Sequence, residues 1–247
     1  MTNNQIARRV LKPAVFLASL APAAILVYLT WAALTGNVSA WPALTGSFSP
    51  NPLSDITNET GVWTLRFLCI TLAVTPLRRV TGWNGVIRFR RMLGLFAFFY
   101  GTLHFLTWII VDRFASLDFP NGMASWTTVR GLTVSIGMDI YKRPFITVGF
   151  TAFMGMLPLA ATSTAGMIRR LGGRRWQALH RLIYLSAIAA VLHYWWLVKA
   201  DIRRPAIYAM VVGVLLAFRV YWARVRAASS TPARRAPAGK GVGNLIW

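Results

Sequence analysis

Six long apolar segments divide the chain, and they constrain its fold more than any other feature. A helix needs about 20 apolar residues to cross a hydrocarbon core of about 30 Å, because each residue rises about 1.5 Å. The segments that reach or approach this length are 13–35, 62–79, 91–112, 144–166, 177–198 and 204–223. We therefore predict an all-α membrane protein with six transmembrane helices.

The composition agrees with a membrane protein. Hydrophobic residues make up 56% of the chain and charged residues 13%, whereas charged residues are about a quarter of a soluble domain. A net charge of +21 could suggest nucleic-acid binding, but the basic residues lie between apolar segments rather than on one amphipathic surface. The pattern therefore favours membrane lipid over nucleic acid. With Cys69 as its only cysteine, the chain can form no internal disulfide.

The charges between the segments predict the orientation. If the N-terminus is cytoplasmic, most Lys and Arg residues lie on the cytoplasmic side, as the positive-inside rule requires, and all six acidic residues lie on the other side. Both termini are then cytoplasmic. We predict a cytoplasmic N-terminus over 1–12, a transmembrane domain over 13–223 and a basic, disordered tail over 224–247. The longest loop, 113–143, is extracytoplasmic, has room for a short surface helix, and has no assigned role.

The chain has three histidines, and all lie in apolar segments. His104 is in the third segment, and His180 and His193 are in the fifth; both segments run outward from the cytoplasm. His104 lies thirteen residues after Arg91, as His193 does after His180, a rise of about 20 Å along a helix. Arg91 and His180 are thus predicted near the cytoplasm, and His104 and His193 toward the far side.

Two imidazoles at one depth on neighbouring helices can bind a haem iron from both sides. Small residues precede both histidines on one helical face: Gly94, Ala97 and Gly101 before His104, and Ser186 and Ala190 before His193. Such residues would leave room for the ring, although they also serve plain helix packing in membranes. We predict that His104 and His193 hold a b-type haem between the third and fifth helices.

The roles of His180 and Arg91 stay open at this point. On a straight helix, thirteen steps of about 100° place His180 roughly 140° from His193, so both face one partner only with tilt or a local irregularity. His180 could ligate a second haem, bind a flavin or quinone, or anchor the helix. Arg91 is a poor iron ligand because guanidinium stays protonated, but it pairs well with a propionate or phosphate. It is equally consistent with the sequence that Arg91 only anchors its helix at the cytoplasmic side of the membrane.

A family resemblance rests on four stretches of sequence: "TGVWTLRFLCITLAVTPLRR", "RFRRMLGLFAFFYGTLHFLTWIIVD", "KRPFITVGFTAFMGMLPLAATSTAGMIRRLGGRRWQALHRLIYLSAIAAVLHYWWLVKAD" and "IYAMVVGVLLAFR". Over about residues 60–112 and 141–220, the chain resembles the MsrQ family. These are haem-binding membrane subunits of periplasmic methionine sulfoxide reductase systems in Gram-negative bacteria. The wider relatives are ferric-reductase-like transmembrane domains, in which histidines on two helices hold stacked b haems.

The resemblance implies a multi-pass b-type cytochrome of the bacterial inner membrane. It would take electrons from the quinone pool or a cytoplasmic flavin reductase and pass them to MsrP, a periplasmic molybdopterin enzyme that reduces methionine sulfoxide in oxidised proteins. The family's histidines map onto His104, His180 and His193, and FMN is implied as an associated cofactor without assigned residues. The wider relatives have a fourth histidine, and Arg91 occupies the matching position here. Because this removes one possible ligand, the chain could hold one haem or two.

Electron transfer would make this chain a subunit of an oxidoreductase system, with no catalytic residue of its own. Two alternatives remain. One is another quinone- or metal-reducing transmembrane cytochrome b. The other is a non-redox transporter or assembly scaffold, whose histidines only form hydrogen bonds between helices.

Overall fold

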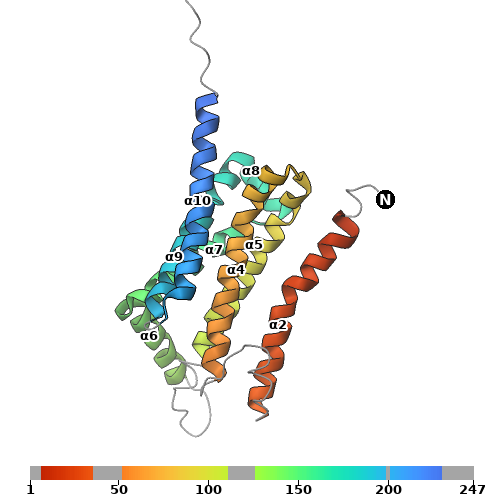
Figure 1. The fold of residues 1–247 in the computed structure, drawn as a ribbon. Coiled ribbons are helices and arrows are strands. Elements are labelled where there is room, and N and C mark those ends of the chain that lie inside the picture. Colours follow the sequence, from red (N-terminus) through yellow and green to blue (C-terminus); the bar gives the residue numbers. More distant parts are fainter. Residues whose placement is uncertain (1–6, 36–51, 111–125, 199–200, 230–247) are drawn as a thin grey trace, which may run out of the picture.

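The computed structural model describes residues 7–35, 52–110, 126–198 and 201–229. These residues form a helical bundle (Figure 1). After a π-helical turn at Ala7–Leu11, the helices are α2 (Lys12–Leu34), α4 (Pro52–Thr81), α5 (Arg90–Trp108), α6 (Trp126–Lys142), α7 (Pro144–Ala161), α8 (Ala165–Leu179), α9 (Leu182–Leu197) and α10 (Arg203–Ser229), with a 3₁₀ helix at Asn84–Arg88 between α4 and α5. An all-helical architecture was predicted, and the described residues confirm it.

Four of these helices are long and apolar enough to cross a membrane, namely α2, α4, α7 and α10. Helix α9 is apolar but has only 16 residues, a length of about 24 Å. Helix α5 has 19 residues and begins with Arg90 and Arg91. The structure therefore supports a multi-pass membrane protein, while six spans and the orientation of the termini stay predictions.

Several helix boundaries differ from the predicted segments. Helix α4 begins ten residues before its predicted span, and α10 continues through Ser229 into the predicted tail. Residues 230–247 of that tail, and 113–125 of the long loop, lie outside the described residues. The rest of that loop forms α6, beside α7 at one end of the bundle (Figure 1).

The predicted fourth and fifth segments are separated by α8, because α7 ends at Ala161 and a new helix begins at Ala165. The hydroxyl groups of Thr162 and Ser163 donate to the carbonyls of Pro158 and Leu159, both at 2.6 Å. The Pro158 carbonyl also accepts from the Thr162 amide, as in a regular helix, whereas the Ser163 amide donates to the Ala160 carbonyl. The Ser163 hydroxyl thus satisfies the Leu159 carbonyl, which a continuing helix would pair with the Ser163 amide. Helix α8 contains Gly172 at φ 72°, in the left-handed region that favours glycine. The amphipathic α8 therefore separates two apolar helices.

The bundle core lies between two helix pairs. Helices α4 and α5 pack closely along their length, as do α7 and α9, and α10 lies against α4 and α9. Phe67 and Leu68 of α4, Tyr100 of α5 and Ala187 of α9 belong to one buried cluster. The ring of Phe67 stacks on that of Tyr100, with centroids 5.2 Å apart.

Tyr100 also attaches α2 to this core. Its hydroxyl group donates to the Ser19 carbonyl at 2.8 Å and accepts from the Ala23 amide at 3.0 Å, so it lies between two groups that an uninterrupted helix pairs directly. Pro22, inside α2, disturbs that hydrogen-bond ladder. The hydroxyl of Tyr100 thus satisfies the backbone of a second helix.

We expect Tyr100→Phe to lower the free energy of unfolding by about 1–3 kcal/mol, because a buried carbonyl and amide lose their partner while the stacked ring remains. Thermal unfolding in detergent measures the change. Tyr141→Phe is the matched control, since Tyr141 is 84% exposed. Equal melting temperatures for the two variants would show that Ser19 and Ala23 re-form a direct bond.

Candidate functional site

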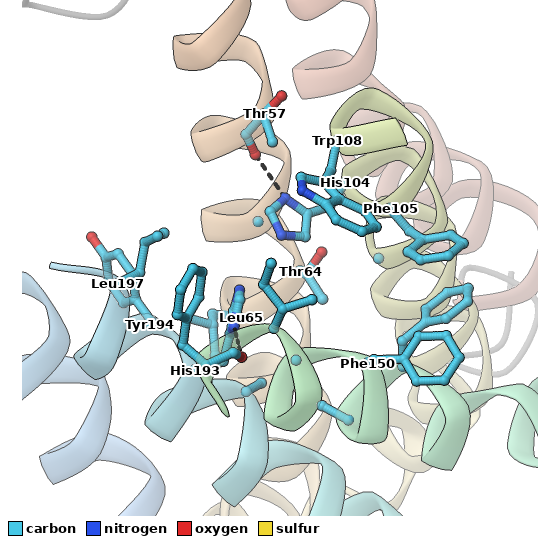
Figure 2. A pocket seen from close by; sticks show the side chains of 18 of the residues that line it. Thr57, Thr64, Leu65, His104, Phe105, Trp108, Phe150, His193, Tyr194 and Leu197 are labelled. Atoms are coloured by element: carbon cyan, nitrogen blue, oxygen red, sulfur yellow. Dashed lines mark hydrogen bonds between the residues drawn. The ribbon is translucent and has the colours of Figure 1, made fainter. Parts of the chain in front are cut away.

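A mostly apolar cavity of about 280 Å³ lies between α4, α5, α7 and α9, near the end of the bundle that carries α6. Its walls come largely from aromatic and aliphatic side chains, including Phe105, Phe150 and Leu65 (Figure 2). His104 from α5 and His193 from α9 both line it. A largely apolar cavity with a few convergent polar groups is typical of a cofactor site.

The two histidines that the sequence paired lie side by side. Their ring centroids are 6.0 Å apart, and the ring planes are inclined by 71°. Figure 2 shows the two rings entering one space from different helices. His104 and His193 are therefore close neighbours, as expected from their similar depths, and their role as haem ligands stays a prediction.

Both rings are held through the same nitrogen. His104 Nδ1 lies 2.8 Å from the carbonyl oxygen of Thr57 in α4, and His193 Nδ1 lies 2.7 Å from that of Phe145 in α7. A carbonyl oxygen only accepts, so each Nδ1 carries the proton and donates it. Each Nε2 then keeps its lone pair, which is the form in which imidazole binds a metal.

A glycine makes room for each ring. An added Cβ at Gly61 of α4 would lie 3.0 Å from His104 Nδ1, and one at Gly149 of α7 would lie 2.6 Å from His193 Nδ1. Each glycine follows the hydrogen-bonded carbonyl by four residues, one helical turn, so the two share a helix face. The same arrangement thus occurs twice, on α4 for His104 and on α7 for His193.

The distance between the rings fits bis-imidazole ligation. A metal–imidazole bond is about 2.0–2.1 Å, and the nitrogen lies roughly 1 Å from its ring centre, so two imidazoles on opposite sides of one iron have centres about 6 Å apart. The residues described contain no cluster of three or more His, Cys, Asp or Glu that could bind a bare metal ion. Haem iron needs only axial ligands from the protein, so the donor set fits haem.

The cavity also has a polar side, at the junction of α6 and α7. Arg143 lines it there, with its Nε 3.4 Å from the carboxylate of Asp139, and Asn58 of α4 lines it nearby. A guanidinium can bind a propionate through two parallel hydrogen bonds. The sequence analysis gave no role to the loop 113–143, which includes Arg143, because nothing in the spacing of this residue relates it to the histidines.

His180 and Arg91 lie away from this cavity. His180 is in the turn between α8 and α9, where its Nδ1 lies 3.0 Å from the Trp176 carbonyl and its ring stacks on the Trp176 indole. The turn separates His180 from helix α9, so the roughly 140° offset calculated for one straight helix does not apply to it. Arg91 is exposed at the start of α5, and the positive charge that acts on His180 is that of Arg90.

The family model described as "Ferric reductase like transmembrane component" matches residues 60–191. Several relatives carry the name "Protein-methionine-sulfoxide reductase heme-binding subunit MsrQ". The one from Ralstonia nicotianae is 57% identical over 180 residues, covering 72% of this chain and 76% of the relative. That from Herminiimonas arsenicoxydans is 51% identical, covering 73% and 76%. That from Xanthomonas euvesicatoria pv. vesicatoria is 45% identical over 226 residues, covering 92% of each.

Proposed function

Since this chain belongs to the ferric-reductase-like transmembrane family and, within it, to the MsrQ heme-binding subunits of protein-methionine-sulfoxide reductase, we propose that it is a b-type cytochrome of the bacterial inner membrane. It delivers electrons to a periplasmic molybdopterin reductase of the MsrP type, and so supports repair of oxidised periplasmic proteins. The chain is the electron-transfer subunit of that system, and the partner carries out the sulfoxide chemistry.

The observation that carries this proposal is the facing pair His104 and His193, with ring centres 6.0 Å apart and each Nδ1 hydrogen-bonded to a carbonyl. In the proposed site His104 and His193 would hold one haem b through their Nε2 atoms. When bound, that haem supplies one-electron chemistry. The carbonyls of Thr57 and Phe145 fix both ring orientations and raise the basicity of each Nε2, and Arg143 pairs with a propionate.

The apolar cavity walls serve the same function. They exclude water from the redox centre, and this affects its reduction potential. The hydrogen bonds from α4 and α7 hold both histidines in fixed orientations, so the protein would present the two ligands already oriented. These features support a role of the site in electron transfer.

The cytoplasmic half of the protein takes up the electrons. His180, with Arg90 nearby and Arg91 at the start of α5, marks the position of a second haem or of a flavin or quinone contact. FMN remains a proposal from the family resemblance, and the donor is the quinone pool or a cytoplasmic flavin reductase. The haem count is accordingly one or two.

We expect His180→Ala to keep the haem spectrum of the His104–His193 pair, because His180 contributes nothing to that cavity. Haem reduction by NADH and a cytoplasmic flavin reductase should slow about tenfold or more, as is common when a residue supporting a redox centre is removed. Stopped-flow absorbance measures the rate, and dithionite reduction at the wild-type rate is the control. Loss of the whole spectrum would instead assign His180 to the fold.

The proposed acceptor is tested by anaerobic mixing. Reduced protein is mixed with a purified MsrP-type reductase and methionine sulfoxide, and the haem absorbance is followed. Reduction of one sulfoxide takes two electrons, and each haem gives one. With a catalytic amount of reductase, we therefore expect complete reoxidation only when the sulfoxide is also present. A haem that is reoxidised by a quinone or ferric chelate but never by the reductase would favour another quinone- or metal-reducing cytochrome b. A colourless protein expressed with ample haem would favour the transporter or scaffold.

A further inference from the structure

A second pocket lies at the other end of α4, far from the histidine cavity. It is lined by Thr75, Arg78 and Arg79 of α4, by Gly82 and Asn84 of the turn that follows, and by Arg226 of α10. By the predicted orientation this end faces the cytoplasm. The pocket joins α10 to the α4–α5 connection, and none of its residues has a role in the proposed haem site.

The turn that shapes the pocket is defined by specific contacts. Gly82 has φ 69°, a left-handed conformation that favours glycine and lets the chain reverse directly after α4. The Asn84 side-chain oxygen accepts a hydrogen bond from Arg78 Nε at 2.7 Å. This bond uses only one edge of the guanidinium, so Arg78 is oriented while its two terminal nitrogens remain for another acceptor.

Three guanidinium groups meet here without a carboxylate among the residues that line the pocket. The charges of Arg78 and Arg226 both act on Arg79, so the groups are close enough to repel one another. The acidic residues of α4, Asp55 and Glu59, lie about 30 Å away along the helix. An anion in the pocket would therefore weaken the repulsion between these guanidinium groups.

One residue that lines the pocket, Thr75, also has an unused hydrogen-bonding group. The hydroxyl oxygen of Thr75 is buried and has no hydrogen-bond partner among the described residues. A buried hydroxyl without a partner costs free energy unless a ligand or water engages it. An oxyanion bound between the arginines would be within the same pocket as this donor.

The surroundings indicate where that anion comes from. The Arg79 guanidinium lies over the Trp222 ring, 5.2 Å from its centroid, and Trp83 is exposed in the turn beside the pocket. Tryptophans concentrate at the level of lipid headgroups, and basic pockets between transmembrane helices bind anionic headgroups on the cytoplasmic side. We propose that this pocket binds the phosphate group of an anionic phospholipid, which holds α10 against the end of α4.

The test uses the purified full-length protein and native mass spectrometry. Phosphatidylglycerol and phosphatidylcholine are added separately, and the retained lipid is counted. We expect the wild type to retain phosphatidylglycerol several-fold more than phosphatidylcholine. Arg79→Gln with Arg226→Gln should abolish this preference. Arg169→Gln with Arg224→Gln is the control, because it removes the same charge from exposed positions outside the pocket.

The haem spectrum shows whether each variant is folded. Because the pocket is remote from the histidines, a pocket variant should keep this spectrum. A missing spectrum in the wild type would therefore contradict the haem proposal, and lipid retention tests the lipid proposal separately. Thr75→Val provides a milder second variant that keeps the side-chain shape and all charges; it should weaken phosphatidylglycerol retention a few-fold. Equal retention by the pocket variants and the control would overturn the proposal. If inorganic phosphate or pyrophosphate raises the melting temperature of the wild type but not of the double variant, and lipid is not retained, the site takes a soluble phosphate instead.

Discussion

His193→Ala is expected to remove the reduced b-type haem spectrum from the purified protein, which is the largest effect of any substitution considered. In the proposed site His193 supplies one of two axial ligands, and no other His, Cys or Met lines that side of the cavity within α9. Alanine leaves the iron with one ligand, His104. His104→Ala should have the same effect from the other side.

The measurement is the dithionite-reduced minus oxidised spectrum, scaled to protein concentration. Leu192→Ala is the matched control, because Leu192 is the neighbouring α9 residue, is 44% exposed and undergoes a similar truncation. A second variant, His193→Gly, is examined with added imidazole, which can occupy the space of the missing ring. Recovery of the spectrum identifies a ligand; a purely structural histidine would give a wild-type spectrum in His193→Ala and no response to imidazole.

The histidine pair shows how far sequence reasoning reaches here. Helical rise is a property of the backbone, so residues at equal distances from equivalent boundaries on two parallel segments reach similar depths. That reasoning placed His104 beside His193 correctly without any knowledge of side-chain packing. It could not locate the turn at His180, because counting along a helix does not show where the chain bends between Leu179 and Leu182.

The contacts that fix the pair could not be predicted from the sequence. Gly61 and Gly149 are two of 19 glycines, and only the packing of α4 on α5 and of α7 on α9 distinguishes them from the others. Gly101 was chosen for its spacing before His104, yet the atom nearest to an added Cβ there belongs to Met156. Small residues on one helix face indicate close packing, but they do not say which neighbour approaches.

Gly149→Ala is expected to displace His193 and to weaken haem binding about tenfold or more, the range observed when a group that orients a metal ligand is removed. The added Cβ would lie 2.6 Å from His193 Nδ1, 2.8 Å from Cε1 and 2.9 Å from Cγ. A ring in contact along one whole edge cannot escape by a small rotation. It must move away from α7, which breaks the 2.7 Å hydrogen bond to the Phe145 carbonyl.

A graded series of glycine variants separates this contact from a general effect on the helices. An added Cβ at Gly61 meets His104 at 3.0 Å, whereas one at Gly213 of α10 has no neighbour within 4 Å. Haem content and the low-spin character of the spectrum should therefore fall in the order Gly213→Ala, Gly61→Ala, Gly149→Ala. Gly213→Ala should match the wild type in haem content and be slightly more stable, because alanine is favoured over glycine inside a helix by about 1 kcal/mol.

The series also tests the role of the carbonyls. If the Phe145 carbonyl orients His193 and raises its basicity, a variant that retains some haem should show a higher reduction potential, because a less basic ligand stabilises ferric iron less. Potentiometric titration of Gly149→Ala measures this shift. A wild-type spectrum and potential in Gly149→Ala would mean that α7 does not determine the position of His193. The proposed ligation would then rest on the distance between the rings alone.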